Sequence, residues 1–204
     1  MPLRLCYITD RRALEPRLLL PFIEEAVQAG IDIVQIREKD LPTRELLRLA
    51  EGAVAAAKGN AARIIVNDRL DIALAVGADG VHLGTQSLPA HAVRGNVPEG
   101  FLIGVSCHSR EDVLAAEAAR ADYVVLGPIF ETPSKIAYGP PLGVAKLGEV
   151  TAAARIPVLA LGGITVERVR ACLEAGAAGV AGIRIFQDAP SLAARVQELR
   201  AEFL

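Results

Sequence analysis

A short pattern recurs four times along the 204 residues of the chain. In each copy a predicted helix ends in a glycine or another small residue, and a turn of two or three residues leads directly into an apolar strand. The copies begin at Ala29, Val76, Ala119 and Ala175. Gly30 and Gly77 are 47 positions apart, which is room for two strand–helix units of about 22 to 25 residues each. The chain therefore holds about eight such units.

The expected strands are continuous apolar runs, which indicates burial on both faces, as in a parallel sheet with helices outside. We place them near Leu3–Thr9, Asp32–Arg37, Ala62–Val66, Gly80–Leu83, Leu102–Ser106, Tyr123–Gly127, Pro157–Leu161 and Gly179–Ile183, with a last helix from about Ser191 to Phe203. Eight units predict an α/β fold, a single-domain (βα)8 TIM barrel over residues 1–204. The alternative, an open doubly wound sheet, needs a glycine-rich first turn, and Thr9–Arg12 contains no glycine.

Composition and charge narrow the classes of function. The chain is 52% hydrophobic with a net charge of −2, and it contains no run of basic residues, so we expect no nucleic-acid or membrane partner. No apolar run approaches the roughly 18 residues of a membrane span, and the N-terminus lacks the order of a secretory signal. Cys6, Cys107 and Cys172 stand far apart among apolar neighbours, which favours reduced, packed thiols in a cytoplasmic protein.

Polar residues gather at the C-terminal ends of the expected strands, where TIM barrels carry their chemistry. The second strand ends in Gln35, Arg37 and Lys39, which strand alternation directs to one face. An unpaired charge at the end of an apolar run is costly, so two cations and an amide there indicate an anionic ligand such as a phosphate or pyrophosphate. The alternative is a solvated start of the loop.

The next three strands add further polar groups. Asn67 and Asp68 follow the third strand and would suit Mg2+ that bridges to a pyrophosphate; alternatively, Asp68 caps the following helix. His82 lies near the end of the fourth strand and is either a site residue or a satisfied core histidine. Ser106, at the end of the fifth strand, can donate to a phosphate, with His108 beside it or capping the next helix.

The last three strands contribute two more sets of groups. The long loop after the sixth strand carries Thr132, Ser134 and Lys135, a second set of anion-binding side chains; a purely structural loop is the alternative. After the seventh and eighth strands stand Gly162, Gly163, Ile183 and Arg184, where many barrels hold a phosphate on backbone N–H groups. An ion pair with Asp188 is the alternative for Arg184. Two separated anion sites, for a pyrophosphate and a monophosphate, indicate a reaction that joins two phosphorylated substrates.

The ordered motifs resemble those of thiamine-phosphate synthases and of their paralogues, the TenI thiazole tautomerases. The match runs nearly end to end and comprises Gln35-Ile36-Arg37-Glu38-Lys39, Asn67-Asp68-Arg69, His82-Leu83-Gly84, Gly104-Val105-Ser106, Gly127-Pro128-Ile129-Phe130 and Gly162-Gly163-Ile164, together with Thr132, Ser134 and Lys135. Each motif alone is weak, but the ordered set is specific. The synthases join a hydroxymethylpyrimidine pyrophosphate to a thiazole phosphate and release pyrophosphate.

The resemblance implies a role for each group of residues. The pyrimidine pyrophosphate would be held by Gln35, Arg37, Lys39, Asn67, Ser106 and Lys135, of which Arg37, Lys39, Ser106 and Lys135 would be catalytic. Asp68 would bind Mg2+. The thiazole phosphate would be held by Thr132, Ser134, Gly163 and Ile183, with His82, His108, Gly162 and Arg184 as further substrate-binding candidates. Small phosphorylated substrates are the implied partners, and a homodimer is one assembly to be considered.

Two departures from the family pattern keep alternatives open. Ser87 stands where the synthases usually carry a second metal-binding Asp, and Arg184 stands where they usually carry a small Ser. TenI proteins also lack the metal pair, yet Pro128 follows the glycine after the sixth strand as in the synthases, where a TenI tautomerase has a histidine. We therefore favour a thiamine-phosphate synthase. The alternatives are a TenI-like thiazole tautomerase or thiazole-phosphate-binding protein, and a non-catalytic phosphate-ligand-binding barrel.

Overall fold

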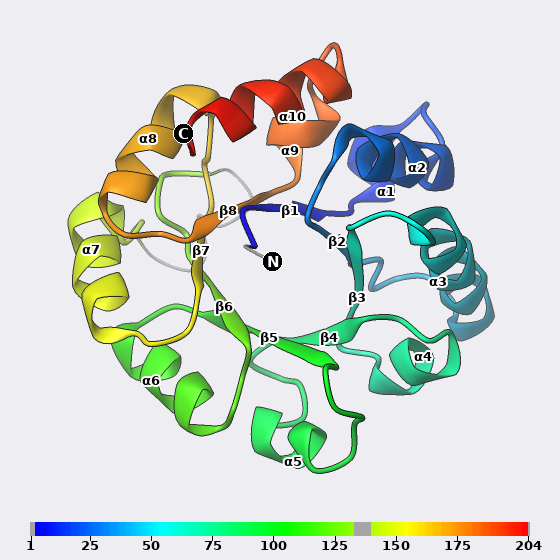
Figure 1. The fold of residues 1–204 in the computed structure, drawn as a ribbon, viewed down its shortest axis with the longest axis horizontal. Coiled ribbons are helices and arrows are strands. Elements are labelled where there is room, and N and C mark those ends of the chain that lie inside the picture. Colours follow the sequence, from blue (N-terminus) through cyan, green and yellow to red (C-terminus); the bar gives the residue numbers. More distant parts are fainter. Residues whose placement is uncertain (1–2, 133–139, 204) are drawn as a thin grey trace.

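The computed structural model describes residues 3–132 and 140–203. Parallel strands close into a barrel in sequence order, with β8 paired back to β1 (Figure 1). The strands are β1 (Leu5–Ile8), β2 (Ile33–Ile36), β3 (Arg63–Asn67), β4 (Gly80–Leu83), β5 (Leu102–Cys107), β6 (Tyr123–Leu126), β7 (Val158–Leu161) and β8 (Gly179–Gly182). The predicted (βα)8 TIM barrel is confirmed, and each predicted strand end lies within two residues of the observed one.

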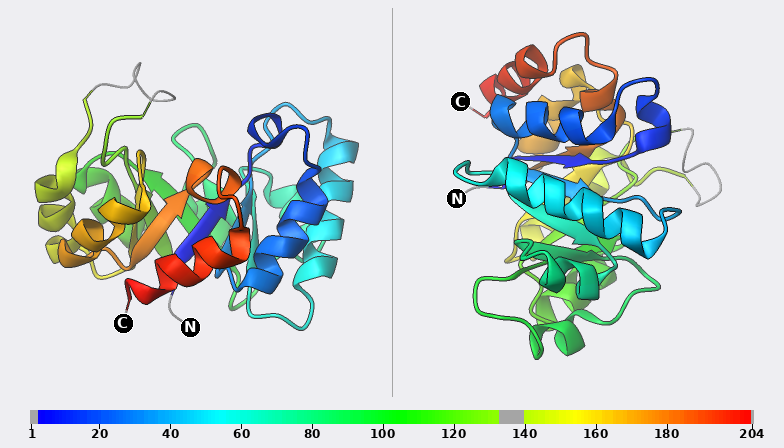
Figure 2. Two further views of the ribbon diagram at one scale, coloured as in Figure 1. Left: turned by 90° about the horizontal axis from the view of Figure 1, so that it is seen from above. Right: turned by 90° about the vertical axis from the view of Figure 1, so that its right-hand side faces the viewer.

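Helices form a ring outside the strands (Figure 1). They are α1 (Arg11–Leu14), α2 (Leu19–Ala29), α3 (Thr43–Ala57), α4 (Leu70–Ala75), α5 (Ala90–Arg94), α6 (Arg110–Ala118), α7 (Gly143–Ala153), α8 (Val166–Glu174), α9 (Arg184–Gln187) and α10 (Leu192–Ala201). The start of β1 and the end of α10 lie at one end of the barrel (Figure 2). Because all strands are parallel and β1 starts at this end, the loops that follow the strands open at the other end, which we call the mouth.

Apolar side chains fill two layers of the molecule. Inside the barrel, Cys6, Ile33, Ile65, Tyr123 and Leu159 belong to one buried cluster, and a larger cluster lies between the strands and the helices. All three cysteines are buried and free of disulfides, as predicted. Within residues 3–132 and 140–203, no helix has the length and apolar character needed to cross a membrane.

The fourfold sequence repeat corresponds to a repeated corner between a helix and every second strand. Gly30, Gly77 and Gly176 have φ angles of 92°, 66° and 85°, and Arg120 takes the same left-handed conformation in the third copy, with φ of 66°. Glycine is favoured in this conformation because a side chain there crowds the backbone. The chain therefore turns from helix into strand in the same way in all four copies.

Three of the four corners end in an aspartate at the closed end of the barrel, opposite the mouth. In Asp32, Asp79 and Asp122, the carboxylate accepts a hydrogen bond of 2.6 to 2.8 Å from a backbone N–H of the preceding strand and pairs with an arginine. The fourth copy has Ala178 at this position.

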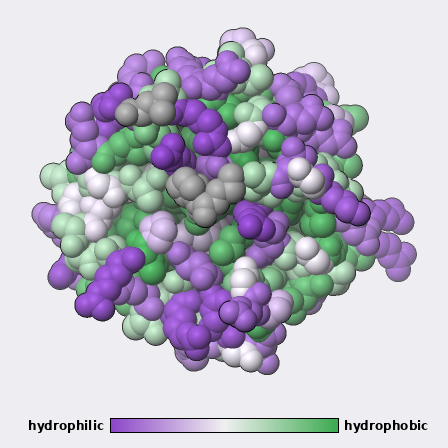
Figure 3. Space-filling model, viewed as in Figure 1, coloured by the Kyte–Doolittle hydropathy of each residue, from purple (hydrophilic) through white to green (hydrophobic). Residues whose placement is uncertain are grey.

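Seen along the view of Figure 1, hydrophilic and hydrophobic side chains are interspersed on the surface (Figure 3).

Candidate active site

Polar side chains line one side of the mouth on four consecutive strands. Gln35 on β2, Asn67 on β3, His82 on β4 and Ser106 on β5 form this set, which we call the polar row. Gln35 donates from Nε2 to Oδ1 of Asn67 (3.0 Å), and Nε2 of His82 lies 2.9 Å from Oγ of Ser106. Strand order thus brings these four predicted site residues to adjacent positions.

Burial determines the charge of His82. Loss of hydration, with a smaller contribution from the positive charge of Arg37, lowers the pKa of His82 to about 3. The imidazole is therefore neutral near pH 7. Its Nδ1 atom is buried and has no hydrogen-bond partner among the described residues, as is the case for the amide oxygen of Gln35 and the hydroxyl of Tyr123. His82 is thus as buried as a core histidine and is also a member of the polar row.

Arg37 places a cation beside the polar row, and Lys39 adds a second cation two residues further along the chain. Arg37 directly follows β2 and is half-buried, whereas Lys39 is exposed. The effect of Arg37 on the pKa of His82 shows that its charge lies near this buried ring. Neither Arg37 nor Lys39 forms an ion pair with a residue in the described ranges. Two cations with no ion-pair partner among the described residues are suited to bind an anion.

Two residues that shape this part of the mouth were missed by the sequence prediction. Thr9 and Glu38 are buried polar residues, and the hydroxyl of Thr9 donates to Oε1 of Glu38 (2.6 Å). The alternation of side chains along an extended segment could have indicated that Glu38 is buried. If Arg37 and Lys39 face the mouth, Glu38 between them faces the helices. A buried carboxylate needs a hydrogen-bonding or charged partner.

Asp68 is the candidate metal ligand. It is exposed, and it adopts a left-handed φ of 66° directly after β3. The predicted alternative for this residue is wrong, because the N-cap of α4 is Arg69 and no side chain caps that helix. Ser87, in place of the second carboxylate, accepts a hydrogen bond at Oγ from the backbone N–H of Gly84 (2.7 Å).

The donor set around Asp68 is small. Within residues 3–132 and 140–203, no cluster of three or more His, Cys, Asp or Glu side chains could hold a metal ion. Mg2+ in enzymes often uses one or two carboxylates and completes its shell with water and substrate phosphates. Asp68 therefore fits Mg2+ in the one-carboxylate form, with a phosphorylated ligand present.

The loops after β5 and β6 meet at His108. This residue donates from Nδ1 to the carbonyl oxygen of Gly127 (2.5 Å), and the helix cap considered for it is provided by Ser109 instead. Thr132 is half-buried at the edge of the described region. The predicted site residues Ser134 and Lys135 lie outside the described residues.

Gly162 and Gly163 allow the loop after β7 to pack closely on the loop after β6. Their φ angles are 98° and 62°. A Cβ atom on Gly162 would lie 2.6 Å from Cβ of Pro128, and one on Gly163 would lie 2.5 Å from the carbonyl oxygen of Glu131. A side chain at either position would therefore force the two loops apart. In the structure, these glycines allow the loop after β7 to approach the loop after β6 closely.

Ile183 and Arg184 form the start of the short helix α9. Ile183 is the N-cap residue, and Arg184 is the first helical residue and is exposed. Asp188 contacts Arg184 through a backbone hydrogen bond of 2.9 Å, and the alternative ion pair between their side chains is absent from the described structure. Arg184 is exposed and forms no ion pair with a described residue, so its guanidinium is a candidate to contact a ligand.

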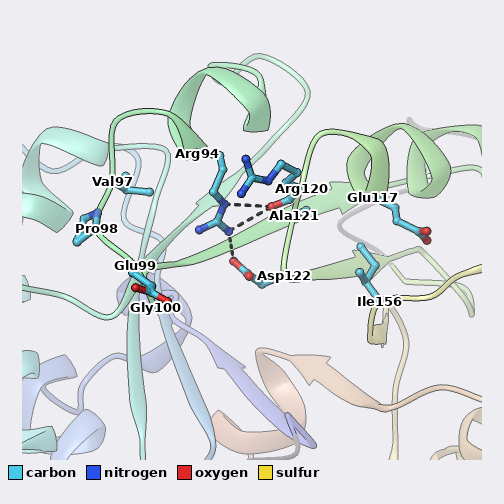
Figure 4. A pocket seen from close by; sticks show the side chains of 10 residues that line it. All are labelled: Arg94, Val97, Pro98, Glu99, Gly100, Glu117, Arg120, Ala121, Asp122 and Ile156. Atoms are coloured by element: carbon cyan, nitrogen blue, oxygen red, sulfur yellow. Dashed lines mark hydrogen bonds and ion pairs between the residues drawn. The ribbon is translucent and has the colours of Figure 1, made fainter.

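One pocket lies at the closed end of the barrel and is not part of this site. It has a volume of about 650 Å3 and is lined by Arg94, Glu99, Glu117, Arg120 and Asp122, among others (Figure 4). Arg94 is bonded to the carboxylate of Asp122 and to the carbonyl oxygen of Arg120. The charge of Arg94 is thus compensated within the protein, whereas Arg37 and Lys39 have no ion-pair partner in the part of the chain that the structure describes.

Comparison with known proteins identifies the family. The family model described as thiamine monophosphate synthase matches residues 5–186. The chain belongs to the thiamine monophosphate synthase family. It is 47% identical over 194 residues to a Geobacter sulfurreducens protein named "Putative thiamine-phosphate synthase", covering 95% of this chain and 91% of that protein. It is 42% identical over 193 residues to the thiamine-phosphate synthase of Methanoculleus marisnigri, covering 95% and 92%.

A solved structure agrees with this assignment. The thiamine phosphate pyrophosphorylase from Pyrococcus furiosus superposes with a TM-score of 0.88 at 34% identity, covering 98% of this chain and 95% of that one. The predicted resemblance is confirmed. As a member of the thiamine monophosphate synthase family, the chain is a thiamine-biosynthesis enzyme of transferase type that acts on small phosphorylated substrates.

Proposed function

We propose that the chain catalyses the synthase reaction itself, in which hydroxymethylpyrimidine pyrophosphate and thiazole phosphate form thiamine phosphate and pyrophosphate. One observation carries the proposal: Arg37 stands beside the polar row, and neither Arg37 nor Lys39, two residues further along, forms an ion pair with a described residue. A pyrophosphate calls for several positive charges and hydrogen-bond donors. A protein that bound only a monophosphate on the loops after β7 and β8 would have no use for this arrangement.

The proposed reaction has two steps, the cleavage of a C–O bond and the formation of a C–N bond. The bond between the pyrimidine methylene carbon and the pyrophosphate oxygen breaks, and its electron pair leaves with pyrophosphate. The thiazole nitrogen then attacks the resulting pyrimidinylmethyl cation and forms the new C–N bond. Arg37, Lys39 and Lys135 would stabilise the negative charge on the leaving group, and Ser106 would donate a hydrogen bond to it. Mg2+ held by Asp68 would add positive charge at the same group.

The thiazole phosphate would occupy the other side of the mouth. The interior there is apolar, with Ile8, Val125, Leu161 and Ile183 in or against the interior cluster, and such a wall suits an uncharged ring. We assign its phosphate to Thr132, Ser134, Gly163 and the Ile183 loop, with His108, Gly162 and Arg184 nearby. In this arrangement Gln35, Asn67 and His82 contact the pyrimidine substrate.

A TenI-like thiazole tautomerase or thiazole-phosphate-binding protein is the second candidate, and Ser87 favours it. This residue removes one metal-binding carboxylate, and its hydroxyl is engaged by the backbone of Gly84.

Incubation of the purified protein with both phosphorylated precursors and Mg2+ tests the proposal. We expect thiamine phosphate and pyrophosphate in equal amounts. A reaction without the thiazole phosphate is the control. Conversion of a thiazole tautomer without any thiamine phosphate would replace the proposal by the tautomerase. Binding of thiazole phosphate without conversion of any substrate would leave only the binding protein.

The setting of the enzyme is part of the proposal. We expect a cytoplasmic protein, because the three cysteines stand among apolar neighbours as reduced thiols do. We expect no nucleic-acid partner, because the net charge is −2 and the sequence has no basic run. A homodimer is the assembly to test, by light scattering on the purified protein.

A further inference from the structure

Cations and carboxylates alternate in the turn after β2. Arg37 and Lys39 belong to the proposed pyrophosphate site, and Glu38 and Asp40 stand between and after them. A carboxylate this close to a lysine or arginine is a natural ion-pair partner, and such a pair would compete with a bound anion. In this molecule both carboxylates are bonded elsewhere.

Arg11, the first residue of α1, contacts both carboxylates at once. Its Nη1 atom donates to Oε2 of Glu38 (3.1 Å) and to Oδ1 of Asp40 (2.6 Å), and its Nη2 atom donates to Oδ2 of Asp40 (2.6 Å). The backbone N–H of Arg11 adds a bond to Glu38 (3.1 Å). The side chain of Glu38 is 2% exposed, so its position is well defined. Arg12 makes a second contact to Asp40 (2.5 Å).

Thr9 links this cluster to the backbone of the site. Its hydroxyl donates to Oε1 of Glu38 (2.6 Å) and accepts from the backbone N–H of Arg37 (2.9 Å). Thr9 is fully buried. A continuous path of hydrogen bonds therefore runs from Arg11 through Glu38 and Thr9 to the backbone of Arg37.

We infer that Arg11 is a positioning residue for the pyrophosphate site. By binding Glu38 and Asp40, Arg11 keeps both carboxylates away from Arg37 and Lys39 and leaves these two cations free for the ligand. This inference rests on the proposed function of the site. Without Arg11, the carboxylate of Asp40, which is 40% exposed, keeps the single contact to the more exposed Arg12 and becomes available to Lys39 as well.

Arg11→Gln tests the inference, because it removes the charge and retains a hydrogen-bond donor. We expect calorimetry with inorganic pyrophosphate and Mg2+ to show about five- to tenfold weaker binding. The KM for the pyrimidine pyrophosphate should rise by a similar factor, while kcat and the KM for thiazole phosphate change less than about twofold. Arg12→Gln is the matched control, because Arg12 is 72% exposed and its one ion pair within the described residues is to Asp40. The affinity of this variant should stay within about twofold of wild type. Thermal unfolding of each variant reports whether it is folded.

A second variant separates positioning from a merely structural role. Asp40→Asn alone should change pyrophosphate affinity little, because Arg11 and Arg12 already hold that carboxylate. Arg11→Gln combined with Asp40→Asn should regain most of the affinity lost in Arg11→Gln. Wild-type affinity in Arg11→Gln, or no such recovery in the double variant, would overturn the inference and leave the proposed function standing. A wild-type protein that binds no pyrophosphate would overturn both.

Discussion

Replacing Gly104 by alanine should disturb the polar row from within the barrel. Gly104 lies on β5, in register with His82 on one side and Tyr123 on the other. An added Cβ would lie 2.3 Å from Cζ of Tyr123, 2.4 Å from its hydroxyl oxygen and 2.6 Å from Nδ1 of His82. Both rings are buried, so neither can move aside into solvent, and both must shift within a close-packed interior.

The magnitude follows from the two clashes. Overpacking a core by one methyl group typically costs about 1–3 kcal/mol, and because two buried rings are displaced we expect about 3 kcal/mol. For a chain of this length, each kcal/mol lowers Tm by about 2–4 °C, so Tm should fall by about 6–12 °C. Because His82 is bonded to Ser106 at 2.9 Å, its displacement also moves the hydroxyl, and kcat/KM should fall about tenfold or more.

Urea unfolding followed by circular dichroism measures the stability, with Gly95→Ala as the control. A Cβ on Gly95 would meet nothing closer than 3.9 Å, and its φ of −72° accepts alanine, so the free energy of unfolding should change by less than about 0.5 kcal/mol. Adding Tyr123→Leu to Gly104→Ala makes room for the new methyl group. The loss of unfolding free energy in the double variant should therefore be smaller than the sum of the losses in the two single variants, by about 1 kcal/mol or more. If Gly104→Ala unfolds like the control, or if the two costs simply add, the packing argument is wrong.

Four further predictions concern other parts of the molecule. Arg37→Ala and Lys39→Ala should each lower kcat/KM by about 10- to 150-fold, from about 1.5–3 kcal/mol per charge-assisted hydrogen bond, with Tm nearly unchanged; full activity in either variant would remove that cation from the mechanism. Calorimetry should detect no tight Mg2+ binding without ligand, because Asp68 is a single carboxylate, and should detect binding once inorganic pyrophosphate is added; tight binding to the free protein would contradict this. Asp32→Ala should lower the free energy of unfolding in urea by about 3 kcal/mol, because two backbone N–H groups and a guanidinium lose their acceptor; a loss below about 1 kcal/mol would refute it. Arg184→Ser should weaken thiazole phosphate binding by about 1–3 kcal/mol in calorimetry, whereas unchanged binding or newly gained synthase activity would identify Arg184 as an obstruction.

The fold could be predicted because its signals are local. Continuous apolar runs indicate strands buried on both faces, and glycines such as Gly30 and Gly77 indicate where a helix ends in the left-handed conformation. Strand ends were predicted only to within two residues because pairing decides them. Asn67 belongs to β3 because it pairs with His82 of β4, and nothing local to Asn67 shows this. Similarly, no local signal shows that Arg120 adopts a left-handed φ.

The positions of the site residues could be predicted, but their partners could not. Parallel strands in a closed barrel bring their C-terminal ends to one rim, so strand order alone places Gln35 beside Asn67. The partner of Glu38 depends instead on α1, since Arg11 is 27 residues away in sequence. Alternation shows which face a side chain takes, and only the packing of distant elements shows which charge it meets. The charge that Glu38 meets decides whether a cation of the turn after β2 binds a neighbouring carboxylate or remains available to a substrate.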